Sequence, residues 1–317
     1  MGLSASLPLV ARPAAKVNLT LAVAPRGEDG YHPLRSVFLR IGLTDELVIS
    51  GAPLATRDSL SVSGLPGCPV EGNLVLRAFA LLREALGQPM LSLRAQLDKR
   101  IPLGAGLGGG SADGAAALEL ALAAWGAGLA PSRLAELALA LGSDVPFFLA
   151  DAPAALVEGR GEGVTPLPAV RGGAGVLLAT SAQPLSTGAV FARYDDLAAD
   201  SAGAERATDE LAAALRAGLD GAGLTALAGR VRDANDLWPA GLALAPELGP
   251  MRDAVEAATQ RAWLMSGSGR SLFSLHPSAA EAAEAGRRLA HDRAAALSDV
   301  VFHAVDLDGQ VEAWRNP

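Results

Sequence analysis

Alternation of apolar and polar side chains marks several short strands along the chain. In residues 15–23, polar side chains at every second position from Lys16 to Thr20 share one face, and aliphatic side chains fill the other. This pattern predicts a half-buried strand on which Lys16 and Asn18 stand roughly 7 Å apart, close enough to bind one ligand. The alternative is a polar face that is simply solvated. The same kind of pattern predicts strands within residues 35–41, 46–50, 59–63, 90–97, 154–168, 175–180 and 300–307, and a strand pair around 266–269.

Helical periodicity separates these strands. An amphipathic helix opens at Glu71-Gly72-Asn73 and runs to about Leu86, and an Ala/Leu-rich helix ends near Gly126. The Ala/Gly/Asp-rich stretch 197–230 keeps helical periodicity, which predicts a soft helical insert rather than disorder. Further helices are predicted over residues 132–141, 206–218, 250–260 and 278–292.

The length and the order of these elements predict two domains. A chain of 317 residues is long enough for about two hydrophobic cores. Gly172-Gly173 precedes a fresh strand and predicts the boundary, which gives an N-terminal domain over 1–172 and a C-terminal domain over 173–317. The second domain is expected to be α+β with antiparallel strand pairing.

Composition excludes several classes of protein. Half of the residues are hydrophobic and 19% are charged, which excludes a disordered chain. No apolar run is long enough to span a membrane, and no secretory signal is apparent. A net charge of −8 argues against nucleic-acid binding, and the single cysteine, Cys68, suits the reducing cytoplasm. The four histidines lack zinc spacing. A cytoplasmic enzyme acting on a small molecule remains, and the sequence is silent on its oligomeric state.

A glycine-rich loop at residues 101–111 is the strongest candidate for a binding site. It contains five glycines between Gly104 and Gly110, and Ser111 is positioned to cap the helix that follows. Unpaired N–H groups at a helix start favour a bound phosphate. A dinucleotide-binding loop is excluded because the expected acidic residue is missing about twenty positions later, and a P-loop is excluded because Gly110 stands where its lysine belongs. A glycine turn that only lets a strand meet a helix is the alternative.

Lysine usage points to two further candidates. Of the 26 basic residues only Lys16 and Lys99 are lysine, which indicates a bias toward arginine codons. Under such a bias, a retained lysine is expected where a compact ammonium is needed and a planar guanidinium does not serve.

Two other sites are weaker when each is taken alone. Asp144 lies between the helix-stopping Gly142 and Pro146, so a stiff turn holds it as a working carboxylate or as a helix cap. Tyr31 and His32 stand side by side and are suited to framing a planar ring, or they are ordinary loop residues.

Three motifs together carry a resemblance to a known family. They are Pro-Ala-Ala-Lys-Val-Asn-Leu-Thr-Leu from Pro13, Pro-Leu-Gly-Ala-Gly-Leu-Gly-Gly-Gly-Ser-Ala from Pro102, and Met-Ser-Gly-Ser-Gly-Arg-Ser-Leu-Phe from Met265. In this order and at these separations they resemble the GHMP kinases, which include galactose, homoserine, mevalonate and phosphomevalonate kinases. The family usually has a small residue or proline where Arg270 stands, and the resemblance is weakest over 195–230.

Further matches narrow the resemblance to the members that phosphorylate a sugar alcohol linked to cytidine diphosphate, in non-mevalonate isoprenoid precursor synthesis. These matches are Asp29-Gly30-Tyr31-His32, Gly72-Asn73-Leu74, Asp98-Lys99-Arg100-Ile101-Pro102, Gly142-Ser143-Asp144-Val145-Pro146 and Ala234-Asn235-Asp236. The resemblance implies a two-domain α+β GHMP kinase fold with the active site in the cleft between the domains. It implies ATP and a cytidine diphosphate sugar alcohol as ligands, with no nucleic acid and no membrane.

The resemblance also implies roles for individual residues. Asp144 becomes the catalytic base and Lys16 its charged partner, while Asn73 and Lys99 lie near adenosine. The ATP phosphates fall on Pro102, Leu103, Gly104, Ala105, Gly106, Leu107, Gly108, Gly109, Gly110, Ser111 and Ala112. The substrate contacts are Asn18, Tyr31, His32, Thr187 and Phe191, with Tyr31 and Phe191 flanking the cytosine. Mg²⁺ is expected with ATP, and its ligands are unknown; Ser111 and Asp113 are candidates by position only.

Two rival functions remain open on the sequence. One is a GHMP kinase for another alcohol, such as homoserine or mevalonate, against which the Asp29-Gly30-Tyr31-His32 segment argues. The other is a catalytically inactive nucleotide-binding regulator on the same fold, which would be expected to have lost Lys16 or Asp144.

Overall fold

The chain forms two compact units, each assembled from separate segments. A computed structural model describes residues 7–52, 55–87, 91–181, 183, 185–197, 201–292, 294–298, 300–307, 309 and 311–315. The first unit comprises Met1–Ala15, Thr44–Leu103 and Gly108–Asp151. The second unit comprises Lys16–Leu43, Gly104–Leu107 and Ala152–Pro317.

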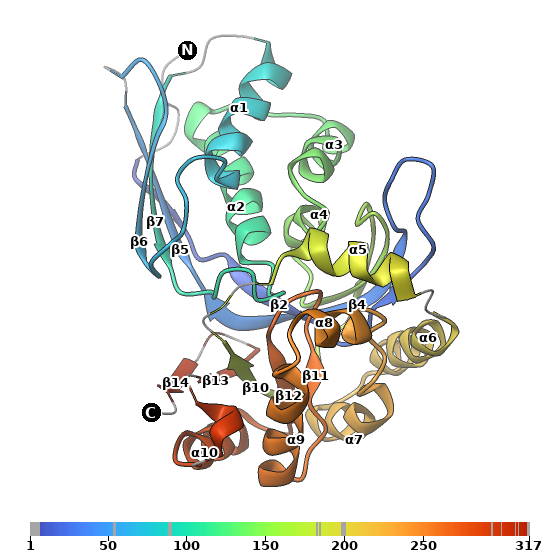
Figure 1. The fold of residues 1–317 in the computed structure, drawn as a ribbon. Coiled ribbons are helices and arrows are strands. Elements are labelled where there is room, and N and C mark those ends of the chain that lie inside the picture. Colours follow the sequence, from blue (N-terminus) through green and yellow to red (C-terminus); the bar gives the residue numbers. More distant parts are fainter. Residues whose placement is uncertain are drawn as a thin grey trace. The chain divides into compact units, whose positions relative to one another are not determined.

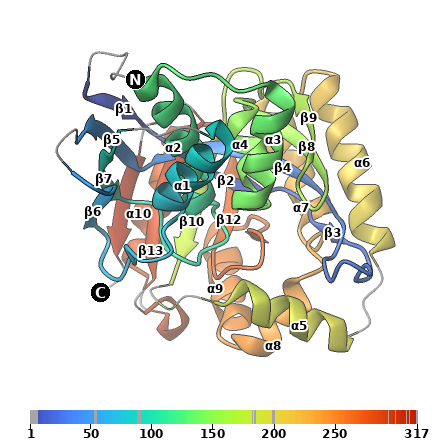
Figure 2. The same cartoon turned by 90° about the horizontal axis from the view of Figure 1, so that it is seen from above.

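A four-stranded sheet and four helices make up the first unit. The strand order is β1-β5-β7-β6, antiparallel except for the parallel β6–β7 pair. The strands are β1 (Leu9–Ala11), β5 (Glu46–Gly51), β6 (Ser59–Gly64) and β7 (Leu93–Lys99). The helices are α1 (Leu74–Leu86), α2 (Gly109–Trp125), α3 (Pro131–Leu141) and α4 (Val145–Leu149). Helices α1 and α2 cover one face of the sheet (Figures 1 and 2).

Helix α2 is the buried centre of the first unit, and its small residues allow the neighbouring elements to pack closely around it. It packs against α1, α3, α4, β1 and β5, so alanines rather than large side chains face its neighbours. At Gly114 an added Cβ would lie 2.9 Å from Leu141 Cδ2 and 3.2 Å from Leu74 Cβ. This close approach fixes the start of α2 firmly against α1 and α3.

Two sheets lie in the second unit. One has the order β2-β4-β8-β9, with β3 also paired to β4, and the other has the antiparallel order β11-β12-β10-β13-β14. The strands of the first sheet are β2 (Ala14–Asn18), β3 (Ala22–Val23), β4 (Leu34–Thr44), β8 (Ala154–Gly159) and β9 (Gly163–Leu167). Those of the second are β10 (Gly175–Thr180), β11 (Leu264–Met265), β12 (Leu272–His276), β13 (Val301–Asp306) and β14 (Val311–Arg315).

Helices close the core of the second unit. They are α5 (Thr187–Leu197), α6 (Ala202–Arg216), α7 (Gly221–Val231), α8 (Trp238–Leu244), α9 (Leu248–Thr259), α10 (Ala279–Ala290) and the short 3₁₀ turn η1 (Ala295–Leu297). Helix α10 packs on β10 and β13, as Figure 1 shows at the red end of the chain. Trp263, Phe302 and Met265 lie in the apolar core that α5, α8, α9 and α10 share with these strands.

The predicted elements are largely confirmed, and two of the differences bear on the candidate site. The antiparallel strand pairing expected in the C-terminal part is confirmed by the sheet of β10 to β14. The helical nature of 197–230 is confirmed within the described residues by α6 and α7. The single half-buried strand over 15–23 is wrong: it divides into β2 and β3, and both of its faces are buried. Its polar face is not solvated because Asn18 Nδ2 donates to Ser36 Oγ at 3.0 Å and Thr208 Oγ1 donates to Thr20 Oγ1 at 2.8 Å. Helix α5 was not predicted, since its apolar positions are too few to stand out.

Two further properties concern the character of the helices and the charge of two buried histidines. Across the described ranges, no helix combines the length and apolar character that crossing a membrane requires. Burial lowers the pKa of His276 and that of His303 to about 4, so both imidazoles are uncharged at neutral pH.

Candidate active site

In the second unit, the glycine loop is held by the first and third sequence motifs. Lys16 N donates to Leu107 O at 3.0 Å, and Ser266 Oγ donates to Gly106 O at 2.9 Å. Gly106 has φ +76°, and an added Cβ would lie 1.9 Å from Ser266 O. Only glycine fits there, because a side chain would collide with backbone and strain the left-handed conformation.

In the first unit, the loop runs directly into α2. The N-cap is Gly108 at φ 72°, and no side chain caps the helix. The expectation that Ser111 caps α2 is wrong: the helix begins at Gly109, which places Ser111 inside the first turn. The first N–H groups of α2 are therefore left for an anion, at the positive end of the helix dipole.

Lys16 is a buried ammonium in contact with the loop. Its side chain is 3% exposed, and Nζ donates to Asn18 Oδ1 at 2.6 Å and to Gly106 O at 3.0 Å. It also lies 4.7 Å from the centre of the Phe38 ring. Lys16 and Asn18 are thus in direct contact with one another, and the charge sits beside the loop backbone; their binding of a common ligand stays a prediction.

Asp144 lies on the turn between α3 and α4 in the first unit. It occupies the N-cap position of α4 and is half-buried, but its side chain makes no capping hydrogen bond to that helix. Pro146 stiffens the backbone in the first turn of α4, and on the other side α3 ends before Gly142. The geometry therefore does not give Asp144 the role of a helix cap.

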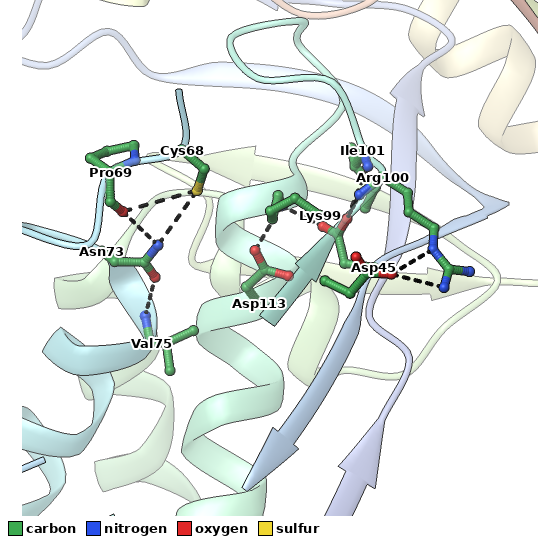
Figure 3. Close-up of polar contacts among 10 residues, drawn as sticks. Asp45, Cys68, Pro69, Asn73, Val75, Lys99, Arg100, Ile101 and Asp113 are labelled. Carbon is green, nitrogen blue, oxygen red and sulfur yellow. Dashed lines mark hydrogen bonds and ion pairs between the residues drawn. The ribbon is translucent and has the colours of Figure 1, made fainter. Parts of the chain in front are cut away.

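Lys99 is enclosed by two carboxylates in the first unit, as Figure 3 shows. Its Nζ donates to Asp45 Oδ2 and, at 2.8 Å, to Asp113 Oδ2. Asp45 Oδ1 accepts from the backbone N–H groups of Arg100 at 2.5 Å and Ile101 at 2.9 Å. We call Asp45, Lys99 and Asp113 the buried triad; it joins the end of β7 to the first turns of α2, directly beside the glycine loop.

Burial and the neighbouring charges together shift the pKa values of Lys99 and Asp113 in the buried triad. Burial opposes the charge on Lys99, but Asp113 and Asp45 outweigh it and raise the pKa of that ammonium above its ordinary value. Burial also raises the pKa of Asp113 to about 7; Lys99 opposes this rise and the Asp45 charge adds to it. Among the described residues, Asp113 Oδ1 is one of the buried side-chain atoms without a hydrogen-bond partner.

Asn73 and Cys68 lie near the buried triad (Figure 3). Asn73 caps α1, since its Oδ1 accepts from Val75 N at 3.0 Å, and its Nδ2 donates to Pro69 O at 3.1 Å. Cys68 Sγ is 3.8 Å from the same Nδ2, and burial raises the pKa of the Cys68 thiol. The start of α1 predicted at Asn73 is confirmed.

Substrate residues expected from the sequence gather in the second unit. The rings of His32 and Phe191 have centres 5.4 Å apart, and Thr187 Oγ1 accepts from Ser268 Oγ at 3.0 Å. Tyr31 is exposed and carries the Arg160 guanidinium 3.6 Å above its ring centre. The structure thus brings His32, Phe191 and Thr187 onto or against α5.

Several site residues escape sequence reasoning. Asp45, Asp195 and Ser266 contact predicted site residues, but each lies far from its partner in the chain. Of these only Ser266 carried a signal, as a member of the third motif.

The described residues contain no preformed metal centre. No group of three or more His, Cys, Asp or Glu side chains there is arranged to hold an ion. Asp113, a candidate by position, directs Oδ2 to Lys99, whose positive charge disfavours a cation.

Known proteins similar to this chain in sequence share one name and one family. Residues 73–159 match the family described as GHMP kinases N terminal domain. A "4-diphosphocytidyl-2-C-methyl-D-erythritol kinase" of Symbiobacterium thermophilum is 41% identical over 277 residues, covering 87% of this chain and 92% of the relative. A protein of the same name from Thermobifida fusca is 42% identical, covering 91% of this chain and 92% of the relative.

Solved structures agree in fold. A crystal structure of "4-(cytidine 5'-diphospho)-2C-methyl-D-erythritol kinase" is 32% identical with a TM-score of 0.69, covering 94% of this chain and 98% of that one. A homoserine kinase from Cytophaga hutchinsonii has the same TM-score of 0.69 at 19% identity, covering 99% of both chains, and shows the fold alone. The expected α+β GHMP kinase fold is confirmed.

Proposed function

The chain belongs to the 4-diphosphocytidyl-2-C-methyl-D-erythritol kinases of the GHMP kinase superfamily, and from this premise we propose how its residues divide the work. The activity is transfer of a phosphoryl group from ATP to the 2-hydroxyl of 4-diphosphocytidyl-2-C-methyl-D-erythritol. The products are ADP and the 2-phosphate, in the non-mevalonate route to isoprenoid precursors.

The ATP phosphates are held by the loop from Pro102 to Ala112. The observation that carries this proposal is the start of α2, where Gly108 in the left-handed conformation leaves the first N–H groups without a side-chain cap. Glycine at 104, 106 and 108, all with positive φ, lets the backbone approach an anion closely. Asn73 and Lys99 serve the adenosine side, Lys99 through the backbone that its buried triad fixes.

Asp144 is the catalytic base and Lys16 its cationic partner. The substrate hydroxyl oxygen attacks the γ-phosphorus, its proton passes to an Asp144 carboxylate oxygen, and the bond to the β-phosphate oxygen breaks to release ADP. Because such transition states are loose, orienting the hydroxyl matters as much as removing its proton. The Lys16 ammonium stabilises negative charge on the oxygens that transfer. Its contact with Gly106 O supports a place at the phosphates.

Substrate recognition is assigned to Asn18, Tyr31, His32, Thr187 and Phe191. Their support is the cluster of His32 and Phe191 rings and the tie from Thr187 to Ser268 of the third motif. Aromatic faces suit a cytosine ring, and they supply stacking area at low entropic cost.

Mg²⁺ is expected with ATP, and when bound it would neutralise negative charge on the phosphates during transfer. We place the reaction in the cytoplasm, on the ground of the single cysteine, and we keep the sequence division into 1–172 and 173–317 as a proposal about domains.

ADP release by the purified protein tests the assignment of substrate. With Mg²⁺ and ATP, turnover is expected with 4-diphosphocytidyl-2-C-methyl-D-erythritol and not with homoserine or mevalonate. Turnover only with another alcohol would leave a GHMP kinase with a different substrate, and ATP binding without turnover on any of them would favour an inactive regulator.

Asp144→Asn tests the base. The variant keeps the size of the side chain but cannot take a proton, so kcat is expected to fall at least about a hundredfold with the KM for ATP unchanged. Asp151→Asn is the matched control, because Asp151 is an exposed acid at φ 46° soon after α4, a conformation that asparagine also adopts. A kcat near that of the wild type in Asp144→Asn would rule out the base.

A further inference from the structure

Asp195, on α5, makes a contact that the proposed roles leave unused. Its Oδ1 lies 3.0 Å from His32 Nε2, and the His32 side chain is only 6% exposed. On the opposite side of the ring, His32 Nδ1 lies 2.9 Å from Ala24 O. The imidazole is therefore held between a carboxylate and a carbonyl, both in the second unit.

Both partners of this ring are acceptors. A neutral imidazole has one N–H, so it satisfies only one of them, whereas the doubly protonated ring donates to both. The Asp195 carboxylate places a negative charge beside Nε2, on the side of the ring away from Ala24 O. Both ring nitrogens of His32 face acceptor atoms of the protein, so a ligand meets the face or the backbone of His32 and not a free ring nitrogen.

The same carboxylate joins the loop before His32 to α5. Asp195 Oδ2 lies 3.9 Å from Arg26 Nη1, and Arg26 Nε donates to Gly30 O at 2.8 Å. The preceding residue of α5, Tyr194, donates from Oη to Val23 O at 2.6 Å, and its ring meets His32 edge-on at 5.8 Å. Asp195 thus receives contacts from two points of the loop that carries Tyr31 and His32.

From this geometry we propose that Asp195 is a positioning residue for the cytidine diphosphate end of the substrate. It acts through His32: it fixes the plane of the imidazole against Phe191, and it keeps the loop of residues 24–32 against α5. This inference rests on the proposed function, since it takes His32 and Phe191 as contacts of the substrate. It assigns Asp195 no part in phosphoryl transfer, so its loss should weaken the binding of the substrate and leave the chemical step intact.

Asp195→Asn is the informative variant. Asparagine keeps one acceptor oxygen but loses the charge that faces His32 and Arg26. We expect KM for 4-diphosphocytidyl-2-C-methyl-D-erythritol to rise about tenfold, as for a partly exposed charge-assisted contact, with kcat and the KM for ATP within about twofold. Cytidine 5'-diphosphate, used as a competitive inhibitor, should show a parallel rise in its inhibition constant, because it carries the same end of the substrate.

The neighbouring acid provides the matched control. Asp196 is the next residue of α5, is 66% exposed and pairs with Arg193 at 3.4 Å. Asp196→Asn removes the same charge from the same helix, yet should leave all these constants unchanged. An Asp195→Asn enzyme that behaves like Asp196→Asn would overturn the inference. So would an Asp195→Asn enzyme in which kcat falls and the KM values for both substrates rise together.

A double-mutant cycle tests whether Asp195 acts through His32. In a His32→Phe background, adding Asp195→Asn should change KM by less than twofold, because the contact it serves is already absent. A full tenfold effect in that background would contradict the proposal. The wild-type assay separates this inference from the proposed function: absence of wild-type turnover overturns the function, whereas normal wild-type turnover with an inert Asp195→Asn change overturns the inference alone.

Discussion

Replacing Asp113 with asparagine should remove a pH dependence of stability that the buried triad creates. The pKa of Asp113 is raised from an ordinary value of 3.8 to about 7, first because burial penalises its charge. The folded chain therefore binds this proton more tightly than the unfolded chain does. The stabilisation is complete below pH ~4 and is lost as the pH rises toward 7.

The size of the effect follows from the two pKa values. Between pH 5 and pH 7 the unfolded carboxyl is ionised while the folded one largely is not, so the free energy of unfolding should fall by ~2 kcal/mol. Asparagine resembles the protonated carboxyl and does not titrate. The Asp113→Asn variant should lack this fall, and it should be closest to the wild type in relative stability at the acidic end.

Urea unfolding followed by circular dichroism measures the difference. The free energy of unfolding is determined at pH 5, 6 and 7 for the wild type and for Asp113→Asn, and the two pH slopes are subtracted so that all other titrating groups cancel. Asp98→Asn is the control, because Asp98 lies on β7 and pairs with Arg100 near the surface; its slope should match the wild type. Parallel slopes for the wild type and Asp113→Asn would refute the reasoning.

Three further changes test the loop and its surroundings. Gly106→Ala should reduce kcat/KM for ATP at least about a hundredfold in the ADP-release assay, because its Cβ would lie 1.9 Å from Ser266 O; a loss under threefold would contradict the close contact. Lys16→Arg should lower kcat at least tenfold, since a guanidinium does not fit the buried position of the ammonium, and full activity would show that only charge is needed. Alkylation of Cys68, the single thiol, should slow in the presence of ATP if Asn73 marks the adenosine side, as followed by mass spectrometry; equal rates would argue against that placement.

Local patterns in the sequence predicted those parts of the site that depend on neighbours in the chain. Three features each involve residues within a few positions of one another: the N-cap at Asn73, the glycine loop, and the pair Lys16 and Asn18. Such local groups can be recognised directly from the sequence. Ser111 was misassigned because capping propensity favours serine, whereas the left-handed Gly108 let the helix start earlier.

Partners from distant segments could not be predicted in this way. Asp45 lies 54 positions before Lys99. An aspartate is ordinarily expected at the protein surface, so the sequence does not indicate that the fold buries Asp45. The polar face of residues 15–23 was expected to bind a ligand or to be solvated; the solvated alternative is wrong, because Ser36 covers Asn18 and Thr208 covers Thr20. Burial on both faces of a strand is a property of the tertiary structure, which overrides the local alternation.

The interleaved segments of the two compact units constrain how the chain matures on the ribosome. The first unit has all its segments once Asp151 has left the exit tunnel, whereas the second must wait for its C-terminal strands. Until then residues 16–43, with the buried Lys16 and the long strand β4, have no completed core to join. Synthesis thus finishes α2, the helix that follows the phosphate loop, long before the third motif, which fixes Gly106, has been translated. A nascent chain stalled near residue 250 would carry an exposed hydrophobic strand and a loop without its anchor, and this stage is where chaperones are expected to engage it.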